Sequence, residues 1–145
     1  MNIFEELKTD HKTQRSLANT LLRTEGETEE RKSIYEKLRD QLKLHAKSEE
    51  RFFYKPLMEF DMSQEKARHS VAEHHDIDEM IEKLDSTEMS SPAWMTYFRQ
   101  LRELVIHHLD EEENEVFQIA GRVLSNVQKE KLGSDYRKMM DEENA

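Results

Sequence analysis

The segment LKLHAKSEERFFYKP, residues 42–56, contains two polar side chains that do not fit its otherwise helical pattern. In an α-helix with about 100° of rotation per residue, His45 and Glu49 lie on the same side, about 40° apart. That side also carries apolar residues, namely Ile34, Leu38, Leu42, Phe52 and Pro56. An imidazole and a carboxylate in an apolar face must either be held by a partner or reach past their neighbours to water.

The same pattern returns 63 residues later. Four pairs of identical residues share this offset: His11 and His74, His45 and His108, Glu49 and Glu112, and Glu50 and Glu113. Weaker matches share it too: Asp10 with Glu73, Leu38 with Leu101, Leu42 with Val105, and Tyr54 with Phe117. The chain is therefore predicted to contain two αα-hairpins of one design.

The composition favours an all-α fold. Charged residues make up 37% of the chain, and the three Gly and two Pro leave few turns for a sheet. A chain of 145 residues is long enough for one domain that buries roughly two-thirds of its unfolded surface. We predict an up-down-up-down four-helix bundle in residues 1–121, with residues 122–145 as an additional C-terminal helix packed on or near it.

Local signals place the helix boundaries. The four long helices are expected at about residues 2–23, 28–60, 64–84 and 92–120, with Ser91 and Pro92 as a strong start signal for the fourth. Ser125 and Gln128 form a capping-box pattern that starts the last helix, and Gly133 is expected to interrupt it. The apolar face of this helix is expected to close one side of the core through Leu132, Tyr136 and Met139.

Several classes of function are disfavoured by composition. The chain has no Cys, which excludes disulfides, thiolate metal sites and cysteine nucleophiles. Its net charge of −10 disfavours nucleic acid and anionic membranes as partners. No apolar run approaches the length of a transmembrane helix, and the N-terminus does not resemble a signal peptide. We expect a cytoplasmic protein, and a protein partner stays possible.

The seven histidines divide by helical phase. His45, His69, His75, His107 and His108 are each followed by Glu four residues later, so this spacing alone says little in so acidic a chain. His69 and His75 point away from the apolar side of their helix, and His107 is rotated about 100° from His108. These three are interpreted as solvated or flanking. The remaining histidines and two glutamates point into one core: His11, His45, Glu49, His74, His108 and Glu112.

A metal centre explains these six residues best. Burying two carboxylates without compensation costs several kcal/mol each. No Lys or Arg of the second and fourth helices is placed to balance them. Two carboxylates can bridge two metals, each of which takes two imidazole nitrogens and keeps one open position. Mixed nitrogen and oxygen ligands suit iron or manganese, whereas zinc usually takes four ligands.

The motifs resemble the hemerythrin-like family with its HHE cation-binding domain. The matching segments are Asp10-His11, HAKSEERFFYKPL from His45, AEHHDI with His74, and HLDEEENEVF from His108. The resemblance spans about residues 3–121. It implies an oxo- or hydroxo-bridged non-haem di-iron site of the six residues named above, with Glu49 and Glu112 bridging and with Mn or Zn as possible substitutes.

One departure from the family pattern bears on function. Oxygen-carrying members are expected to have a second histidine four residues from the ligand on the third helix, where this chain has Ser70 and Asp78. This argues against simple reversible oxygen transport. Glu50, next to Glu49, is expected to point outward or to support a ligand from outside.

Two functions stay open at the level of sequence. The first is a di-iron protein that binds or senses O2, nitric oxide, peroxide or iron. The second is a di-iron redox enzyme that removes peroxide or reactive oxygen species, with Tyr97 as a candidate hydrogen-bond donor near His108. A metal-free helical interaction domain is a less favoured third reading. Gln14 and Ile77 are candidates to line a ligand pocket, although ordinary packing explains them equally simply.

Overall fold

The computed structural model describes residues 1–144 and contains helices and loops, with no strand in that range. Its helices are α1 (Ile3–Leu21), α2 (Glu29–Glu49), α3 (Lys55–Leu57), α4 (Asp61–Asp85), α5 (Pro92–Glu111), α6 (Phe117–Val123) and α7 (Asn126–Asn144). Two π-helical turns, η1 (Glu50–Tyr54) and η2 (Glu112–Val116), join α2 to α3 and α5 to α6. The predicted all-α class is confirmed. Among the described residues, no helix combines the length and apolarity that a membrane crossing requires.

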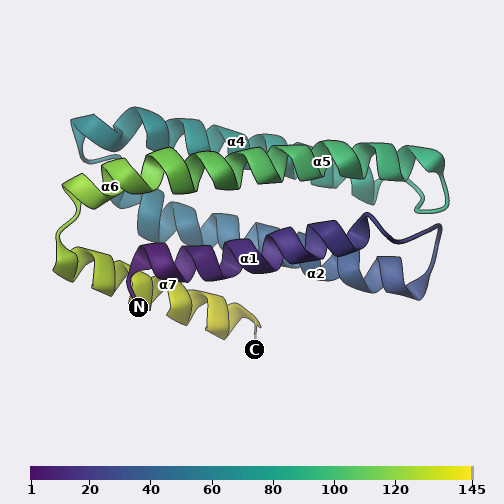
Figure 1. Ribbon diagram of the computed structural model, residues 1–145, viewed down its shortest axis with the longest axis horizontal. Coiled ribbons are helices and arrows are strands. Elements are labelled where there is room, and N and C mark those ends of the chain that lie inside the picture. The colour runs from purple at the N-terminus through teal and green to yellow at the C-terminus, as the bar shows by residue number, and fades with distance from the viewer. Residues whose placement is uncertain (145) are drawn as a thin grey trace.

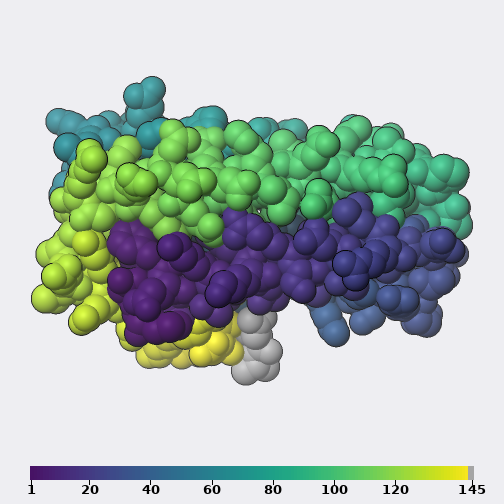
Figure 2. Space-filling model, viewed as in Figure 1, coloured from purple at the N-terminus to yellow at the C-terminus, as the bar shows by residue number. Residues whose placement is uncertain are grey.

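The long helices α1, α2, α4 and α5 run along the longest axis of the molecule (Figure 1). α1 packs on α2, and α4 packs on α5, each pair being joined by a short loop that makes its helices antiparallel. α7 returns along the outside of α1 and α2, at the end of the molecule that carries the N-terminus (Figure 1). In the space-filling view, the side chains of α1 and α5 meet and cover the interior on that face (Figure 2).

The helix starts follow the capping signals. The side chain of Ser91 accepts a hydrogen bond from the backbone of Ala93, directly ahead of the proline at the first helical position. Ser125 and Gln128 exchange both bonds of a capping box. The predicted starts at residues 92 and 126 are therefore confirmed. The predicted joint between the second and third long helices, residues 61–63, was misplaced, because α4 already begins at Asp61 and the turn occupies residues 58–60.

The two π-helical turns change which side chains face the core. Each turn contains one more residue than an α-helical turn. Every later side chain therefore takes the direction that the preceding residue would have in a straight α-helix, a difference of about 100°. A straight helix would bury Phe52 and Pro56, but Phe53 and Leu57 are the fully buried side chains instead. After η2 the same shift buries Ala120, whereas Ile119 stays partly exposed.

The apolar core is divided into two halves by a polar layer. One half lies toward the α1–α2 and α4–α5 loops and includes Leu21, Leu38, Ile81, Trp94 and Phe98. The other half lies toward α7 and includes Ile3, Leu7, Phe53, Leu57 and Tyr136. Along each long helix the residues between these halves are polar and buried. The predicted metal ligands belong to this layer.

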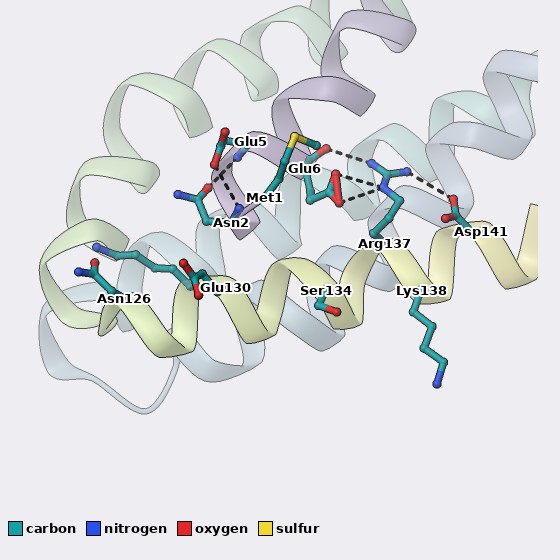
Figure 3. A pocket seen from close by; sticks show the side chains of 11 residues that line it. Met1, Asn2, Glu5, Glu6, Asn126, Glu130, Ser134, Arg137, Lys138 and Asp141 are labelled. Atoms are coloured by element: carbon teal, nitrogen blue, oxygen red, sulfur yellow. Dashed lines mark hydrogen bonds and ion pairs between the residues drawn. The ribbon is translucent and has the colours of Figure 1, made fainter.

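α7 is attached to α1 by packing and by ion pairs. Tyr136 and Met140 are fully buried, while the expected Met139 is only half-buried. The Arg137 guanidinium lies 3.3 Å from both carboxylate oxygens of Glu6 and donates to the Glu6 carbonyl at 3.2 Å (Figure 3). The same guanidinium lies 3.2 Å from Asp10 Oδ1. α7 is thus connected to a residue next to His11.

Gly133 does not interrupt α7, contrary to the prediction, because α7 is continuous from Asn126 to Asn144. Instead, the glycine allows α7 to lie close to the backbone at the start of α1. A Cβ atom at this position would lie 2.6 Å from the carbonyl carbon of Asn2 and 2.7 Å from the backbone nitrogen of Ile3. Only a residue without a side chain lets α7 lie this close to the start of α1.

We therefore expect Gly133→Ala to destabilise the protein by about 1–3 kcal/mol, because the added methyl group overpacks a backbone contact. Gly121→Ala is the matched control, since a Cβ there meets nothing within 4 Å. A helical alanine should instead stabilise the protein by up to about 1 kcal/mol. Urea unfolding measures both changes. Equal stabilities of the two variants would contradict the close approach of α7.

Candidate metal centre

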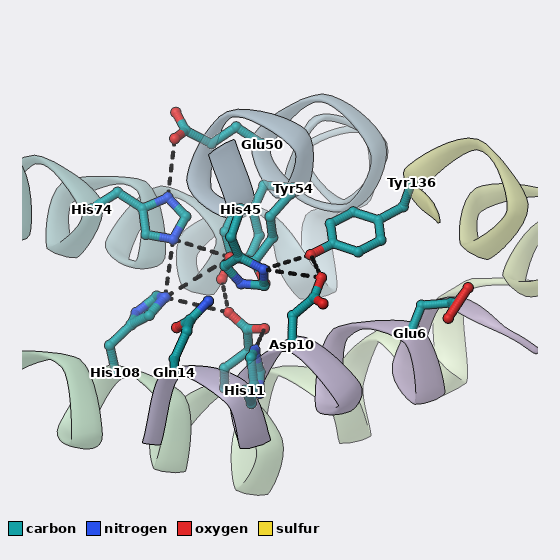
Figure 4. A network of polar contacts seen from close by, with 12 residues as sticks. Glu6, Asp10, His11, Gln14, His45, Glu50, Tyr54, His74, His108 and Tyr136 are labelled. Carbon is teal, nitrogen blue, oxygen red and sulfur yellow. Dashed lines mark hydrogen bonds and ion pairs between the residues drawn. The ribbon is translucent and has the colours of Figure 1, made fainter. Parts of the chain in front are cut away.

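The six predicted ligand residues lie together in the buried polar layer. Figure 4 shows the four histidines among them pointing toward one another from different helices. α1 contributes His11, α4 contributes His74, and α2 contributes both His45 and Glu49. α5 supplies His108 near its end, and η2 supplies Glu112 at its start. None of the six is more than 5% exposed.

All four histidines direct Nε2 toward the two glutamates. The first hairpin places His11 3.3 Å from Glu112 Oε1 and His45 3.5 Å from Glu49 Oε2. The second hairpin places His74 3.0 Å from Glu49 Oε1 and His108 3.4 Å from Glu112 Oε2. Each carboxylate therefore presents one oxygen to the histidine pair of each hairpin, as a bridging carboxylate would.

The Nδ1 atom of every core histidine contacts a second, outer polar residue. Glu113 lies 2.6 Å from His11, Glu50 lies 3.0 Å from His74, and Glu73 lies 2.8 Å from His108. For His45 the contact is the Tyr136 hydroxyl at 2.5 Å, which in turn donates to Asp10. A carboxylate only accepts hydrogen bonds, so these contacts place the proton on Nδ1. The lone pair of a neutral imidazole is then on Nε2, which faces the centre.

The outer ring follows the same 63-residue repeat as the inner residues. Asp10 on α1 supports the histidine of α2, and its counterpart Glu73 on α4 supports the histidine of α5. Glu50 and Glu113, the residues after the two inner glutamates, support the histidines of α4 and α1. Glu50 therefore lies outside the inner residues and contacts His74, in line with its expected outer position.

Two tyrosines at the centre were not found by sequence reasoning. Tyr54 is fully buried and donates its hydroxyl to Glu112 Oε2. Its partner in the repeat is Phe117, whose ring stacks on His11 at 6.2 Å between centroids, so the phenol is present on one side only. The pairing of Tyr54 with Phe117 was a signal that could have indicated this asymmetry. Tyr136 lies on a separate helix and had no signal in the repeat.

Tyr97 does not contact the centre, so its proposed role beside His108 is wrong. The two residues are 11 positions apart on α5, or about 16 Å at 1.5 Å per residue. The Tyr97 ring lies under the Lys83 ammonium, 5.1 Å from it, and packs against the loop half of the core. Helical phase alone placed Tyr97 on the correct face but ignored this distance along the axis.

The polar atoms of the centre fit bound cations. Five of them have no hydrogen-bond partner although they are buried: His11 Nε2, His45 Nε2, Glu49 Oε1, Glu49 Oε2 and Glu112 Oε1. The Nε2 atoms of His74 and His108 lie 3.0 Å apart, so two lone pairs face each other when both imidazoles carry their proton on Nδ1. Two groups with metal-ligating spacing share one carboxylate: His11, His45 and Glu49, and Glu49, His74 and His108.

Burial and mutual charge shift the pKa values of the groups in the centre. Burial, together with the charge of Glu49, raises the pKa of Glu112. Burial alone would also raise the pKa of Glu49, but the charge of His45 holds it well below its usual value. Burial disfavours a charged His45, yet the carboxylates outweigh this and raise its pKa to about 9. Either protons or metal ions must therefore compensate the buried carboxylates.

A small cavity of about 10 Å³ lies beside three of the histidines, on the side of the loop half of the core. It is close to the smallest volume that holds one water molecule. Its lining consists of Gln14, Leu42, His45, Ala46, His74, Ile77, Asp78, Val105 and His108. Gln14 and Ile77 thus line a pocket, which was one of the two interpretations of these residues, the other being ordinary packing. Gln14 is oriented by a 2.7 Å hydrogen bond from its amide to Gln41.

Comparison with known proteins identifies the family. The family model of the hemerythrin HHE cation-binding domain matches residues 2–120. The crystal structure of a hemerythrin HHE cation-binding domain-containing protein from Mycobacterium kansasii superposes with a TM-score of 0.88, covering 98% of this chain and 86% of that one. The two share 22% sequence identity, so this likeness concerns the fold.

No curated protein matches this sequence closely enough to extend the comparison. The family match nevertheless covers all six residues of the inner layer and the four acidic residues of the outer ring. The chain belongs to the family of hemerythrin HHE cation-binding domains.

Proposed function

We propose that the chain binds a non-haem di-iron centre and uses it to bind or sense a small ligand, namely O2, nitric oxide, peroxide or iron itself. The ligands in this proposal are His11, His45, Glu49, His74, His108 and Glu112. The scaffold is an up-down-up-down four-helix bundle closed by α7. The observation that carries the proposal is the set of five buried ligand atoms without hydrogen-bond partners.

The protein's own residues define what such a centre could do. When bound, two iron ions would supply Lewis acidity, reversible electron transfer and an open position for a small ligand. Outer carboxylates hold three of the four imidazoles with the lone pair directed inward, and the Tyr136 hydroxyl does the same for His45. The two apolar halves of the core exclude bulk water. The small cavity beside His74 and His108 has about the volume of one water molecule, which restricts the proposed ligand to the smallest molecules.

The ligand set favours iron over zinc. If two ions shared these six residues and a bridging oxide or hydroxide, each ion would have five ligands, one more than zinc usually takes. Hard oxygen ligands combined with imidazole are typical of iron and manganese sites. The Tyr54 phenol adds a further hard oxygen beside Glu112, on the side of the second hairpin.

A redox enzyme that removes peroxide is the second candidate, and Tyr54 is the observation that favours it. Among the hydrogen bonds of residues 1–144, the only one that a side chain donates to Glu49 or Glu112 comes from the Tyr54 hydroxyl. Burial and the neighbouring charge of Glu112 raise the pKa of this phenol, so it keeps its proton at neutral pH. A phenol in this position could return a proton to a reduced oxygen ligand.

Aerobic reconstitution with Fe(II) tests the main proposal. We expect about two iron ions per chain in the wild type, and a loss of at least one in Glu112→Ala because both hairpins lose a carboxylate oxygen. Elemental analysis measures the ratio. Chelation should also lower the melting temperature, since the ions bind only the native state. Absence of iron after reconstitution, with an unchanged melting curve on chelation, would overturn the di-iron centre.

Peroxide consumption by the iron-loaded protein separates the two candidate functions. For an enzyme, we expect the rate to fall at least tenfold in Tyr54→Phe while the iron content stays at the wild-type level. Tyr35→Phe is the matched control, because this buried tyrosine lies in the loop half of the core and donates to Asp85 at 2.7 Å. A wild-type rate no higher than that of Glu112→Ala would favour binding or sensing over turnover.

Tyr136→Phe tests the support of His45 by α7. The change removes the hydroxyl that links His45 to Asp10 and keeps the ring. We expect metal affinity to fall about 10- to 100-fold, the usual cost of losing such an outer contact. Competition with a coloured chelator measures the affinity, and Tyr35→Phe again serves as the control. Equal affinities of both variants would show that α7 contributes packing alone.

A further inference from the structure

Three histidines outside the centre lie on the surface, as predicted, with side chains 56–75% exposed. Two of them nevertheless meet across α4 and α5. His69 Nε2 lies 3.4 Å from Glu73 on its own helix and 3.2 Å from Glu111 on the neighbouring helix. His107 Nε2 lies 3.0 Å from Glu111 on its own helix and 3.5 Å from Glu73 on the neighbouring helix.

We infer that these four residues, His69, Glu73, His107 and Glu111, form a second metal site, for a divalent transition-metal ion such as Zn²⁺. The inference does not depend on the identity of the ions in the core. It rests on donor type, spacing and charge on the surface where α4 and α5 pack together.

The distances between the imidazole nitrogens and the carboxylate oxygens match those between neighbouring ligands of a tetrahedral site. Bonds of about 2.0–2.1 Å to zinc place the ligand atoms of a tetrahedral site about 3.4 Å apart. The four contacts between imidazole nitrogen and carboxylate oxygen span 3.0–3.5 Å. His69, Glu73 and Glu111 each offer one atom within 4.8 Å of the others. Residues four apart on a helix share a face, so each helix supplies one histidine and one glutamate.

The charges of this cluster also require a cation. Glu73 and Glu111 have side chains only 16% and 18% exposed, so water compensates them incompletely. In residues 1–144, the ion pairs formed by these two carboxylates are all with histidines, and none involves Lys or Arg. With neutral imidazoles, two negative charges would face each other. A divalent ion removes this repulsion and can reach the cluster from solvent past the exposed imidazoles.

Glu73 connects the surface site with the core. One of its oxygens faces His69 and His107, while the other lies 2.8 Å from Nδ1 of His108. Two bound ions would then be joined through one carboxylate and one imidazole. Because Glu73 takes part in both places, a variant of Glu73 cannot test the surface site by itself.

The histidine double variant H69A/H107A tests the site without touching the core. Untagged protein is first loaded with iron and then equilibrated with Zn²⁺, after which elemental analysis measures zinc per chain. We expect one tightly bound zinc more in the wild type than in H69A/H107A, and an affinity at least tenfold higher. His75→Ala is the matched control, since His75 is also exposed but pairs only with Glu79 of its own helix. This control should retain the additional zinc.

Cobalt gives an independent readout, because Co²⁺ in a tetrahedral site absorbs visible light strongly. The extra absorption should appear in the wild type and in His75→Ala but not in H69A/H107A. Equal zinc content and equal cobalt spectra in H69A/H107A and the wild type would overturn the surface site. The comparison is a difference between variants with an identical core. It therefore remains decisive if the core takes no iron. If iron loading is normal but zinc content and cobalt spectra do not differ between the variants, only the surface site is rejected.

Discussion

The structure depends on the burial of two carboxylates, Glu49 and Glu112, at the middle of a helical core. Removing such charges from water costs several kcal/mol each unless partners compensate them. That cost is a large share of the ~5–15 kcal/mol that stabilises a typical domain. The four inward-facing imidazoles cannot compensate as neutral groups, because they present lone pairs to the carboxylate oxygens. Positive charge has to enter the centre, and the helices are arranged around that requirement.

The requirement is met by a layered arrangement in which each layer constrains the next. Apolar side chains above and below keep water out. The outer carboxylates orient the imidazoles and balance part of the charge that bound ions would bring. Some of these carboxylates are themselves paired further out: Arg15 donates to Glu113 at 3.0 Å, and Arg137 reaches Asp10 at 3.2 Å. Glu113 is thus paired with both His11 and Arg15. These two partners lower the pKa of Glu113 to about 2, although burial opposes the change.

The internal repeat supplies symmetry, and a few positions break it. The inner and outer residues of the two hairpins correspond under a single sequence offset. Each hairpin therefore contributes an equivalent set of residues to the centre. The exception that matters for chemistry is Tyr54, whose counterpart Phe117 has no hydroxyl. α7 adds a second asymmetry, because its Tyr136 supports His45, whereas the equivalent His108 is supported by Glu73 directly. The two halves of the centre therefore differ in their proton donors although their inward-facing residues match.

The sequence by itself determined the helical class, the repeat, the six inward-facing residues and the outward position of His69, His75 and His107. These follow from residue type and from a periodicity that holds within one helix. Tertiary structure decided what depends on register and on contacts between distant segments. The π-helical turns moved Phe53, Tyr54 and Leu57 into the core, which a constant 100° per residue cannot foresee. The meeting of Tyr136 with Asp10, and of His69 with Glu111, required knowledge of which helix faces lie against each other, because side chains far apart in sequence interact only once packing fixes their distance.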